Sequence, residues 1–437
     1  MAGGTWTKQN KVRPGAYINF RSKKKEVNML GERGIVTMPL SLPWGPEKQI
    51  IEISVDDDLV DVLGIDITDP SVKLIREAFK RATTLLLYRL NKGTNATATL
   101  EGLTINAKYS GTKGNNITIV IQNNIDNPEE FEVITLFEGK EVDKQIGVKT
   151  IEDIKSNNYV EFKGTGELKS TAGLPLKGGE NGTVTNADYT DYLSAIELYE
   201  FNTMGIPTKD ESIKAIATNF VKRLRESEGK KVQVVLENYP EADYEGVMSV
   251  KNGVILKDGE ITADEAVAFV AGATAGANVN QSLTYSTYDG AIDVDKRYTN
   301  KEIEKALKNG EIIFTISNAK VVIEQDINTL KTFADTKNNE FRKNRVLRVL
   351  DGMANDIKRL WETSYIGKVS NNEDGRNLFK KDIIKYLETL QGISAVENVT
   401  PDDVEAWQGE DKDVVLSRVG VQPVDAMEKL YMDVEVR

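Results

Sequence analysis

Hydrophobic and polar residues alternate most regularly at the two ends of the chain. Near the amino terminus the apolar positions are Ala16, Ile18 and Phe20. Near the carboxyl terminus they are Leu430, Met432, Val434 and Val436. A period of two predicts strands that have one apolar face. We therefore predict extended, strand-forming arms over residues 1–22 and 425–437.

Between the two arms, the composition and the period of the hydrophobic positions differ from one segment to the next. Residues 92–180 are rich in Thr, Asn and Gly and alternate with a period of two, which predicts a small all-β domain. The flanking segments, 23–91 and 181–320, mix helical and strand periods, so we expect one α/β core into which the β domain is inserted. Residues 321–424 are expected to form a C-terminal α/β domain. The predicted fold class is a multidomain α/β protein.

Several individual elements are specific enough to be tested by a structure. A helical period predicts helices over residues 210–227, 340–366 and about 376–390. Apolar runs predict a strand over 232–236 and another over 312–316, the latter pairing with residues 321–323. Thr262 and Thr299 each stand three residues before a glutamate, which is the spacing of a helix capping box.

The longest predicted helix, 340–366, carries a group of basic residues in a chain that is acidic overall. The basic group consists of Arg342, Lys343, Arg345 and Arg348. One interpretation is a solvated helix face with ion pairs inside the helix. The other is a contact surface for an acidic partner, and the sequence favours neither.

Two residue types that carry much enzyme chemistry are missing. The chain contains no cysteine and no histidine. Disulfides, thiolate catalysis, cysteine metal sites and a Ser-His-Asp triad are therefore excluded. Hydrolysis by paired carboxylates or by a lysine base stays open, but no motif indicates it. We expect a structural protein with no catalytic residue, no cofactor and no metal.

Three short motifs resemble ligand sites only loosely. The glycine-rich loop 111–114 precedes a predicted strand, whereas a phosphate-binding loop opens a helix, so a tight turn is favoured. Two acidic clusters could offer oxygen ligands to calcium: Asp56, Asp57, Asp58 and Asp61, and Asp289, Asp293 and Asp295. Neither has the spacing of an EF-hand loop, which favours solvated acidic turns.

Charge and hydropathy narrow the range of partners. The 437 residues carry a formal net charge of −12, which disfavours nucleic acid as the main partner. No apolar run reaches the roughly 18 residues of a membrane span, so we expect no direct membrane insertion. The first residues also lack the apolar segment of a signal peptide.

The two terminal strands have alternative partners. Each could complete a sheet in its own subunit, or each could add to a sheet edge of a neighbouring subunit by β-augmentation. Burying four apolar side chains gains about 6–12 kcal/mol. Ordering the backbone of such a strand costs about 8–16 kcal/mol. One donated strand is therefore near break-even, and donation from both ends would favour cooperative polymers over isolated dimers.

Six short motifs follow one another along the chain. They are residues 13–20 (RPGAYINF), 39–46 (PLSLPWGP), 109–116 (YSGTKGNN), 176–182 (LKGGENG), 288–291 (YDGA) and 423–432 (PVDAMEKLYM). Each is weak alone. In this order, and over essentially the whole length, the chain resembles the tail sheath proteins of contractile phages, prophages and phage-tail-like bacteriocins of Gram-positive bacteria. Ser110 and Asn181 replace residues common in that family, both at positions that look like turns.

The resemblance implies a structural protomer of a contractile tail sheath. Such protomers form hexameric rings that stack into a helical homo-polymer around an inner tail tube protein, and the sleeve contracts to drive the tube through a target envelope. The resemblance also implies baseplate and tail terminator proteins as partners, and a C-terminal domain whose sheet accepts arms from neighbours. Assembly in the bacterial cytoplasm and release by lysis are expected.

Three further expectations complete the interpretation. The inserted domain, 92–180, should face outward as a variable region. As a hypothesis, the helix over 340–366 faces the tube, and its basic group meets an acidic surface. The alternative function is a surface-array or adhesive binding module, and an enzyme comes third.

Overall fold

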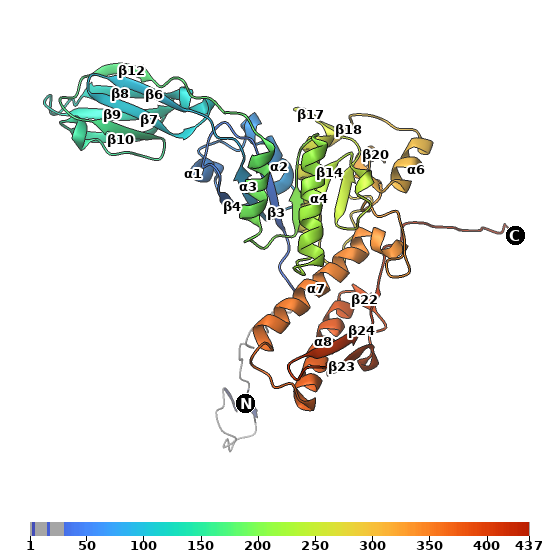
Figure 1. The fold of residues 1–437 in the computed structure, drawn as a ribbon. Helices are drawn as coiled ribbons and strands as arrows, with labels where there is room; N and C mark the ends of the chain where they lie inside the picture. The colour runs from blue at the N-terminus through green and yellow to red at the C-terminus, as the bar shows by residue number, and fades with distance from the viewer. Residues whose placement is uncertain (1, 5–14, 18–29, 437) are drawn as a thin grey trace.

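A seven-stranded sheet lies at the centre of the molecule (Figure 1). The computed structural model describes residues 2–4, 15–17 and 30–436. In spatial order the strands are β19 (Glu311–Ile312), β15 (Val247–Val250), β14 (Gln233–Glu237), β13 (Thr203–Gly205), β3 (Ile35–Leu40), β5 (Thr84–Arg89) and β4 (Ile50–Ser54). Strand β4 runs antiparallel to β5, and the other pairs are parallel. The predicted strand over 232–236 is confirmed as β14.

Helices cover both faces of this sheet. On one face lie α2 (Lys73–Phe79) and α5 (Ala263–Gly276), and on the other lie α3 (Asn186–Ile196) and α4 (Glu211–Glu226). Successive strand residues point to opposite faces, so Leu85 and Leu87 join the core under α5 while Leu86 joins the core under α4. Both faces are buried, which explains why the strands read as continuous apolar runs.

The helix signals in the sequence are confirmed at several ends. Helix α4 fills the predicted range 210–227, and the Asp210 carboxylate accepts hydrogen bonds from the backbone N–H groups of Ser212 and Ile213. Thr262 begins α5, and Thr299 begins α6 (Asn300–Lys308), each with a capping box. These local motifs need no distant partner, so the sequence reports them directly.

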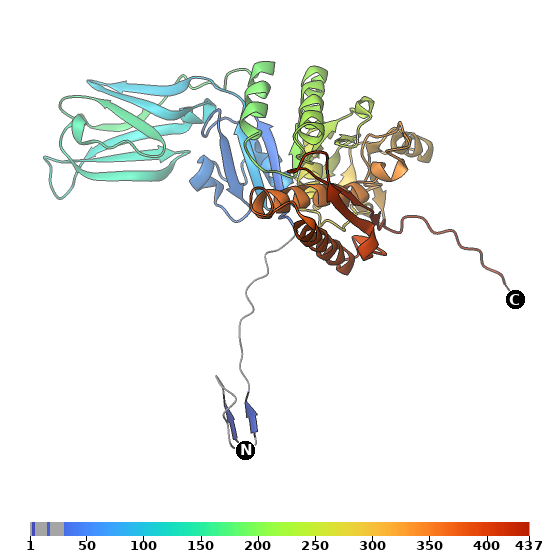
Figure 2. The same cartoon turned by 60° about the horizontal axis from the view of Figure 1, so that its bottom comes forward.

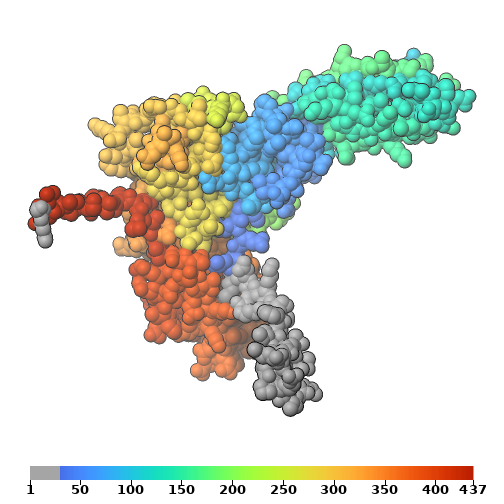
Figure 3. All heavy atoms as spheres, turned by 180° about the vertical axis from the view of Figure 1, so that it is seen from behind, coloured from blue at the N-terminus to red at the C-terminus, as the bar shows by residue number. Residues whose placement is uncertain are grey.

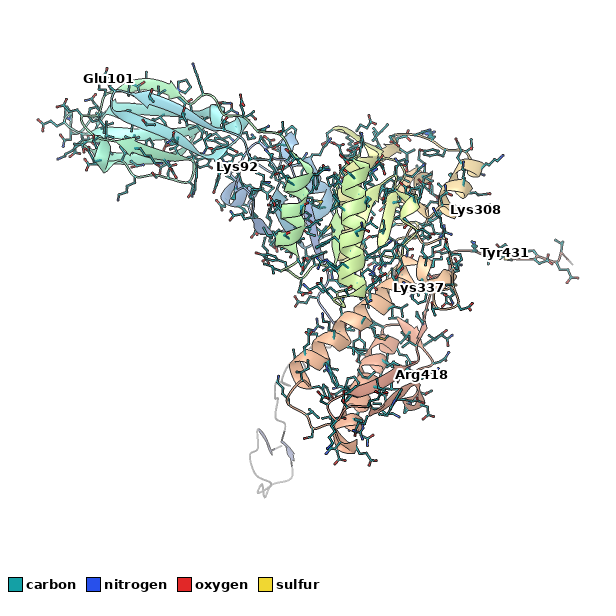
Figure 4. All side chains as sticks on the ribbon, in the orientation of Figure 1. Lys92, Glu101, Lys308, Lys337, Arg418 and Tyr431 are labelled. Carbon is teal, nitrogen blue, oxygen red and sulfur yellow. The ribbon has the colours of Figure 1, made fainter. Side chains whose placement is uncertain are left out.

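Residues 92–180 contain a β sandwich that projects from the central sheet (Figures 1 and 2). One sheet has β11 (Val160–Gly164), β7 (Leu103–Ser110) and β6 (Asn95–Leu100). The other has β10 (Lys140–Val148), β9 (Phe131–Phe137), β8 (Ile117–Asn123) and β12 (Thr171–Pro175). Alternate residues such as Ile117, Ile119 and Ile121 are buried between the two sheets. Figure 4 places Lys92 at the neck of the sandwich and Glu101 toward its outer end.

Side chains from both sides build the neck of the sandwich. The Asn91 side chain exchanges hydrogen bonds with the backbone of Leu42 and donates to the Asn181 carbonyl oxygen at 2.7 Å. Trp44 is buried, and its ring packs edge-to-face on Tyr109 at 5.4 Å between centroids. The two connecting segments are therefore held side by side where they leave the central sheet.

One predicted strand is wrong in its extent. Residues 312–316 were expected to form a single strand, but Ile312 ends β19 in the central sheet and the chain then starts β20 (Phe314–Ser317). Strand β20 forms a hairpin with β21 (Lys320–Ile323) because Asn318 and Ala319 take φ values of 49° and 61° and close a tight turn. A domain boundary at residue 321 would cut through this hairpin.

The remaining small sheet of the core lies beside the hairpin. It contains β17 (Gly259–Ile261), β16 (Val254–Leu256) and β18 (Ala291–Val294), all antiparallel. A short helix, α1 (Leu59–Leu63), lies between β4 and α2 in the sequence. These elements extend the core that is buried under α5, which contains Val254, Ile261 and Val294.

A C-terminal domain is built on two long helices. They are α7 (Asn344–Ser364) and α8 (Glu373–Gly392), packed with β22 (Val396–Glu397), β23 (Val404–Gln408), β24 (Val415–Val419) and β25 (Gln422–Pro423). The prediction that a helix starts at residue 340 is wrong. Residues Asn339–Arg342 form a 3-10 turn, and Lys343 is extended because its backbone bridges to Ile327. The α7 axis runs between the core and the rest of this domain (Figure 1).

The two chain ends lie outside these layers. Near the amino terminus, β1 (Ala2–Gly4) pairs in parallel with β2 (Gly15–Tyr17). At the other end the chain leaves β25 and runs away from the body as a single extended segment (Figures 1 and 2). The predicted strand over 430–436 has no strand partner among the described residues. Among residues 2–4, 15–17 and 30–436, no helix is long and apolar enough to cross a membrane.

Candidate assembly site

The carboxyl-terminal tail, residues 429–436, exposes its apolar side chains to solvent. Leu430 is 82% exposed and Val436 is 92% exposed, and Met432 and Val434 are also open. The tail extends from the body as a thin projection (Figure 3), with Tyr431 well clear of the rest of the molecule (Figure 4). Contiguous exposed apolar residues usually mark an interaction surface. The tail therefore carries an alternating apolar face that its own chain does not cover.

The amino-terminal candidates are described only in part. Ala16 lies in β2, where its backbone is the register partner of Gly3. Ile18 and Phe20 lie outside the described residues. The apolar face predicted for this arm therefore stays a prediction.

The basic group is not an exposed stripe on a helix. Arg342 and Lys343 precede α7, and Arg345 and Arg348 lie in its first turns. Arg348 is buried, pairs with Asp326 at 3.2 Å and donates to the Gln281 carbonyl oxygen. An acidic partner could not reach this guanidinium without displacing Asp326.

The other three basic side chains are also engaged within the chain. Arg342 donates to the Leu307 carbonyl oxygen, and burial lowers its pKa from the usual value. Arg345 donates to the carbonyl oxygens of Asn280, at 2.8 Å, and of Val424. Lys343 forms ion pairs with Glu428 and, at 3.5 Å, with Asp425. Much of this binding is directed at the segment that leads into the tail.

A buried ion pair joins the C-terminal domain to the core. The Arg225 guanidinium of α4 binds both carboxylate oxygens of Asp351 in α7, at 2.6 and 2.8 Å. Burial, the largest single cause, lowers the pKa of Arg225, but the charge and hydrogen bonds of Asp351, together with the nearby Tyr244 and Glu245, outweigh burial and raise it. Asn355, one turn further along α7, exchanges hydrogen bonds with the backbone of Lys231 at 2.9 and 3.0 Å. These contacts fix α7 to the central body.

The C-terminal domain also presents a short, open sheet. Strands β23 and β24 form a two-stranded hairpin in which Trp407 and Leu416 are register partners. Both side chains are more than two-fifths exposed. Arg418 lies on the same hairpin, at the surface in Figure 4. Within the described chain each of these strands has one paired side, so the other side is a free sheet edge.

The loosely matching ligand motifs have ordinary structural roles. The Asp57 carboxylate accepts a hydrogen bond from the Ser54 backbone N–H, and Asp58 caps α1. Asp289 pairs with Arg81 at 2.7 Å, and Asp293 pairs with Arg297 at 2.8 Å. Residues Thr112–Asn116 form a 3-10 turn before β8. Among residues 30–436, no group of three or more acidic side chains is arranged to hold a metal ion.

Sequence reasoning missed the acidic partners of the basic group. Glu428 stands between Met427 and Lys429 in the motif PVDAMEKLYM, and Asp326 follows a strand without any distinguishing pattern. Their partners lie far away in sequence: Glu428 accepts from Thr284, 144 residues earlier. A weak signal exists, because Glu428 stands at the position where the alternation of Leu430 and Met432, continued backwards, would place an apolar residue. Only the folded chain shows what it binds.

An exposed apolar tail and free sheet edges define a building block whose carboxyl-terminal segment is open to another chain. Family models agree along the chain: a tail sheath protein domain III N-terminal region at residues 33–90, a phage tail sheath β-sandwich domain at 91–181, a phage tail sheath central domain at 182–329 and a phage tail sheath C-terminal domain at 336–437.

Relatives match this chain over its full or nearly full length. The phage-like element PBSX protein XkdK of Bacillus subtilis is 42% identical, with all of both chains covered. A crystal structure of a sheath tail protein from Desulfitobacterium hafniense is 52% identical, covers 97% of this chain and 100% of its own, and superposes with a TM-score of 0.88. The chain therefore belongs to the phage tail sheath protein family.

The fold extends to a more distant assembly. A protomer of the anti-feeding prophage helical sheath in its contracted state is 14% identical and superposes with a TM-score of 0.58 over 97% of this chain and 99% of its own. At this identity the match concerns the fold alone. The mixed α/β multidomain fold expected from the sequence is confirmed at that level.

Proposed function

We propose that this protein polymerises as a helical sleeve around an inner tail tube and contracts to drive the tube through a target cell envelope. The observation that carries the proposal is the uncovered apolar face of the tail, residues 429–436. A sheath protomer must bind identical neighbours, and a donated strand supplies backbone pairing together with apolar burial. The free edges of the β23–β24 hairpin are suitable acceptors for such a strand.

The assembly would be symmetric and closed around the tube. We propose rings stacked into a helical homo-polymer, because one acceptor edge and one donated arm on the same body form a head-to-tail interface that generates rings or helices. Hexameric rings are what membership of the tail sheath family implies. The β sandwich projects from the body, which suits an outward position. Baseplate and tail terminator proteins would cap the two ends of the sleeve. Assembly in the bacterial cytoplasm and release by lysis complete the proposal.

The contact with the inner tail tube stays assigned to residues 340–366 as a prediction. Arg342, Arg345 and Arg348 already bind acceptors within the chain, so replacing all three with glutamate would destabilise the body as well as alter any tube contact. A loss of co-assembly in that variant supports the tube contact only if thermal unfolding stays at the parent temperature. Normal sleeved particles would rule the contact out.

The direct test of strand donation is to delete residues 430–437. We expect a folded monomer with an unchanged unfolding temperature, because the side chains of residues 430–436 are exposed and make no hydrogen bond or ion pair with the described body. Negative-stain electron microscopy of the concentrated parent should show striated tubes, and the deletion should show none. Tubes formed by the deletion variant would refute strand donation.

A matched pair of variants separates the two faces of the tail. In the first, Leu430, Met432, Val434 and Val436 are all replaced with serine, which removes the apolar face. In the second, Asp433 and Glu435 are replaced with serine, which leaves that face intact. We expect loss of tubes only in the first variant, since apolar burial drives the pairing.

A further inference from the structure

The last side chain that fastens the carboxyl-terminal tail to the body is the part-buried Glu428. The Glu428 carboxylate accepts hydrogen bonds from the Thr284 hydroxyl and the Gln325 amide, both at 2.8 Å, and from the Lys343 ammonium. Its side chain is only 11% exposed, whereas Met427 before it is fully exposed and Lys429 after it is also open. A part-buried glutamate that accepts three hydrogen bonds thus marks the root of an otherwise exposed segment.

The three partners of Glu428 come from different parts of the fold. Thr284 lies between α5 and β18, Gln325 follows β21, and Lys343 stands at the start of α7. The Thr284 hydroxyl also accepts a hydrogen bond from the Asp326 backbone N–H at 3.0 Å, which orients it toward Glu428. The carboxylate is therefore bound where the core meets the C-terminal domain.

Backbone contacts hold the residues just before Glu428. The Val424 N–H donates to the Ala395 carbonyl oxygen at 3.0 Å, and the Val424 carbonyl oxygen accepts from Arg345. Residues 425–430 then lie along a groove of about 1010 Å³ whose walls include Tyr285, Leu307 and Ile327. The chain is hydrogen-bonded to the body up to Glu428, and over the described residues 429–436 no hydrogen bond or ion pair joins it to the body.

We propose that Glu428 is a positioning residue for sheath assembly, because it fixes the point and the direction in which the donated strand leaves the body. The proposal rests on the strand donation proposed above. It places the pivot of the arm at Lys429, later than the boundary at residue 425 expected from the sequence. A pivot directly before Leu430 lets the apolar strand swing while its root stays on the body.

A residue beyond the middle of α7 binds the chain where the described body begins. The Asp356 carboxylate accepts a hydrogen bond from the Gly31 backbone N–H, and Arg33 donates to the carbonyl oxygens of Ala277 and Thr274 at 2.7 and 2.9 Å. Lys343 and Asp356 are separated by about 20 Å along the helix axis, at 1.5 Å per residue. Asp356 of α7 and its N-cap residue Lys343 thereby bind the chain at Gly31 and at Glu428.

The test compares Glu428→Ala with a matched control, Glu435→Gln, which removes a charge from the free part of the tail. Backbone hydrogen exchange is measured by mass spectrometry on dilute, monomeric protein, and tube yield is measured by sedimentation and electron microscopy after concentration. We expect exchange over residues 424–428 to rise at least tenfold in Glu428→Ala, with the body unchanged, and tube yield to fall at least fivefold. The control should match the parent in both measurements.

A second variant guards against an effect of the alanine itself. Thr284→Val together with Gln325→Leu leaves Glu428 in place but removes two of its three donors, and it should show the same two changes in milder form. Unchanged exchange in both variants would show that Glu428 does not fasten the tail to the body. Faster exchange with normal tube yield would show that this fastening has no role in assembly. If the 430–437 deletion still forms tubes, strand donation fails, whatever the exchange measurement shows.

Discussion

Strand β5 and the carboxyl-terminal tail both consist largely of big apolar residues, yet they occupy opposite environments. Leu85, Leu86 and Leu87 are at most 3% exposed, because β3 and β4 pair with β5 and helices cover both faces. Leu430 and Val436 are more than four-fifths exposed. Strand β5 is thus paired on both sides within the chain, whereas the tail is paired on neither. The difference shows that the described chain supplies neither a partner strand nor a covering helix for the tail. A neighbouring copy is the partner proposed for it.

The largest expected effect on the free energy of unfolding concerns the buried ion pair between the central body and the C-terminal domain. Arg225→Met leaves the buried Asp351 carboxylate without its partner, so we expect a loss of about 3–5 kcal/mol in the free energy of unfolding. Urea denaturation of the protein lacking residues 430–437 measures this without polymerisation. The C-terminal domain would then be confirmed as energetically part of the same body as β5.

A control for this prediction lies on the same helix. Arg223 pairs with Glu197 and Glu228 at the surface, and its side chain is 45% exposed. Exposed pairs contribute about 0–1 kcal/mol, so Arg223→Met should change stability little. Equal losses in both variants would mean that the buried pair does not join the two domains.

The second prediction applies one substitution to both regions. Leu87→Ala opens a cavity under α5 and should cost about 2–5 kcal/mol of unfolding free energy. Leu430→Ala should change that free energy by less than about 0.5 kcal/mol, because the side chain is already in water. The assembly should respond in the opposite order: Leu430→Ala should raise the protein concentration at which tubes appear. A large loss of monomer stability in Leu430→Ala would show that the tail already packs on its own body.

The sequence predicts one of these two regions more completely than the other. Periodicity identified β14, α4 and the inserted β strands because each repeats a local pattern over many residues. The alternation over 430–436 was equally visible, but a pattern of side chains does not state which chain supplies the neighbouring strand. That information lies in the sheet topology, which leaves the tail without a partner in the described chain.

The basic group shows where a local pattern misleads. Arg342, Lys343, Arg345 and Arg348 look like a solvated stripe because their spacing is helical and their partners are remote in sequence. Asp326 and Glu428 neutralise two of them only after the core and the tail root fold against α7. The helix start was misplaced for the same reason, since Lys343 is held extended by a backbone bridge to Ile327.

The smallest expected effect concerns Glu428, at which the exposed tail leaves the folded body. Burial alone would raise the pKa of Glu428, but the hydrogen bonds from Lys343, Gln325 and Thr284 outweigh burial and lower it below the usual value near 4.5. Because the pKa of Glu428 is lowered, its contacts with Thr284, Gln325 and Lys343 are fully stabilising at pH values above the usual glutamate pKa. That stability is lost as the pH falls through the folded-state pKa. Among charged neighbours, Asp425 lies 3.5 Å from Lys343 and competes weakly for it.

Protection of the amides over residues 424–428, corrected for intrinsic exchange, should therefore stay constant from about pH 7 to pH 5 and fall below about pH 4.5. Glu428→Gln should remove this pH dependence, while Asp425→Asn should keep it. The chain has no histidine, so no side chain of ordinary pKa accounts for a transition between about pH 5.5 and 8. Loss of protection in that upper range would mean that a group other than Glu428 fastens the tail, and the border between body and arm would have to be placed elsewhere.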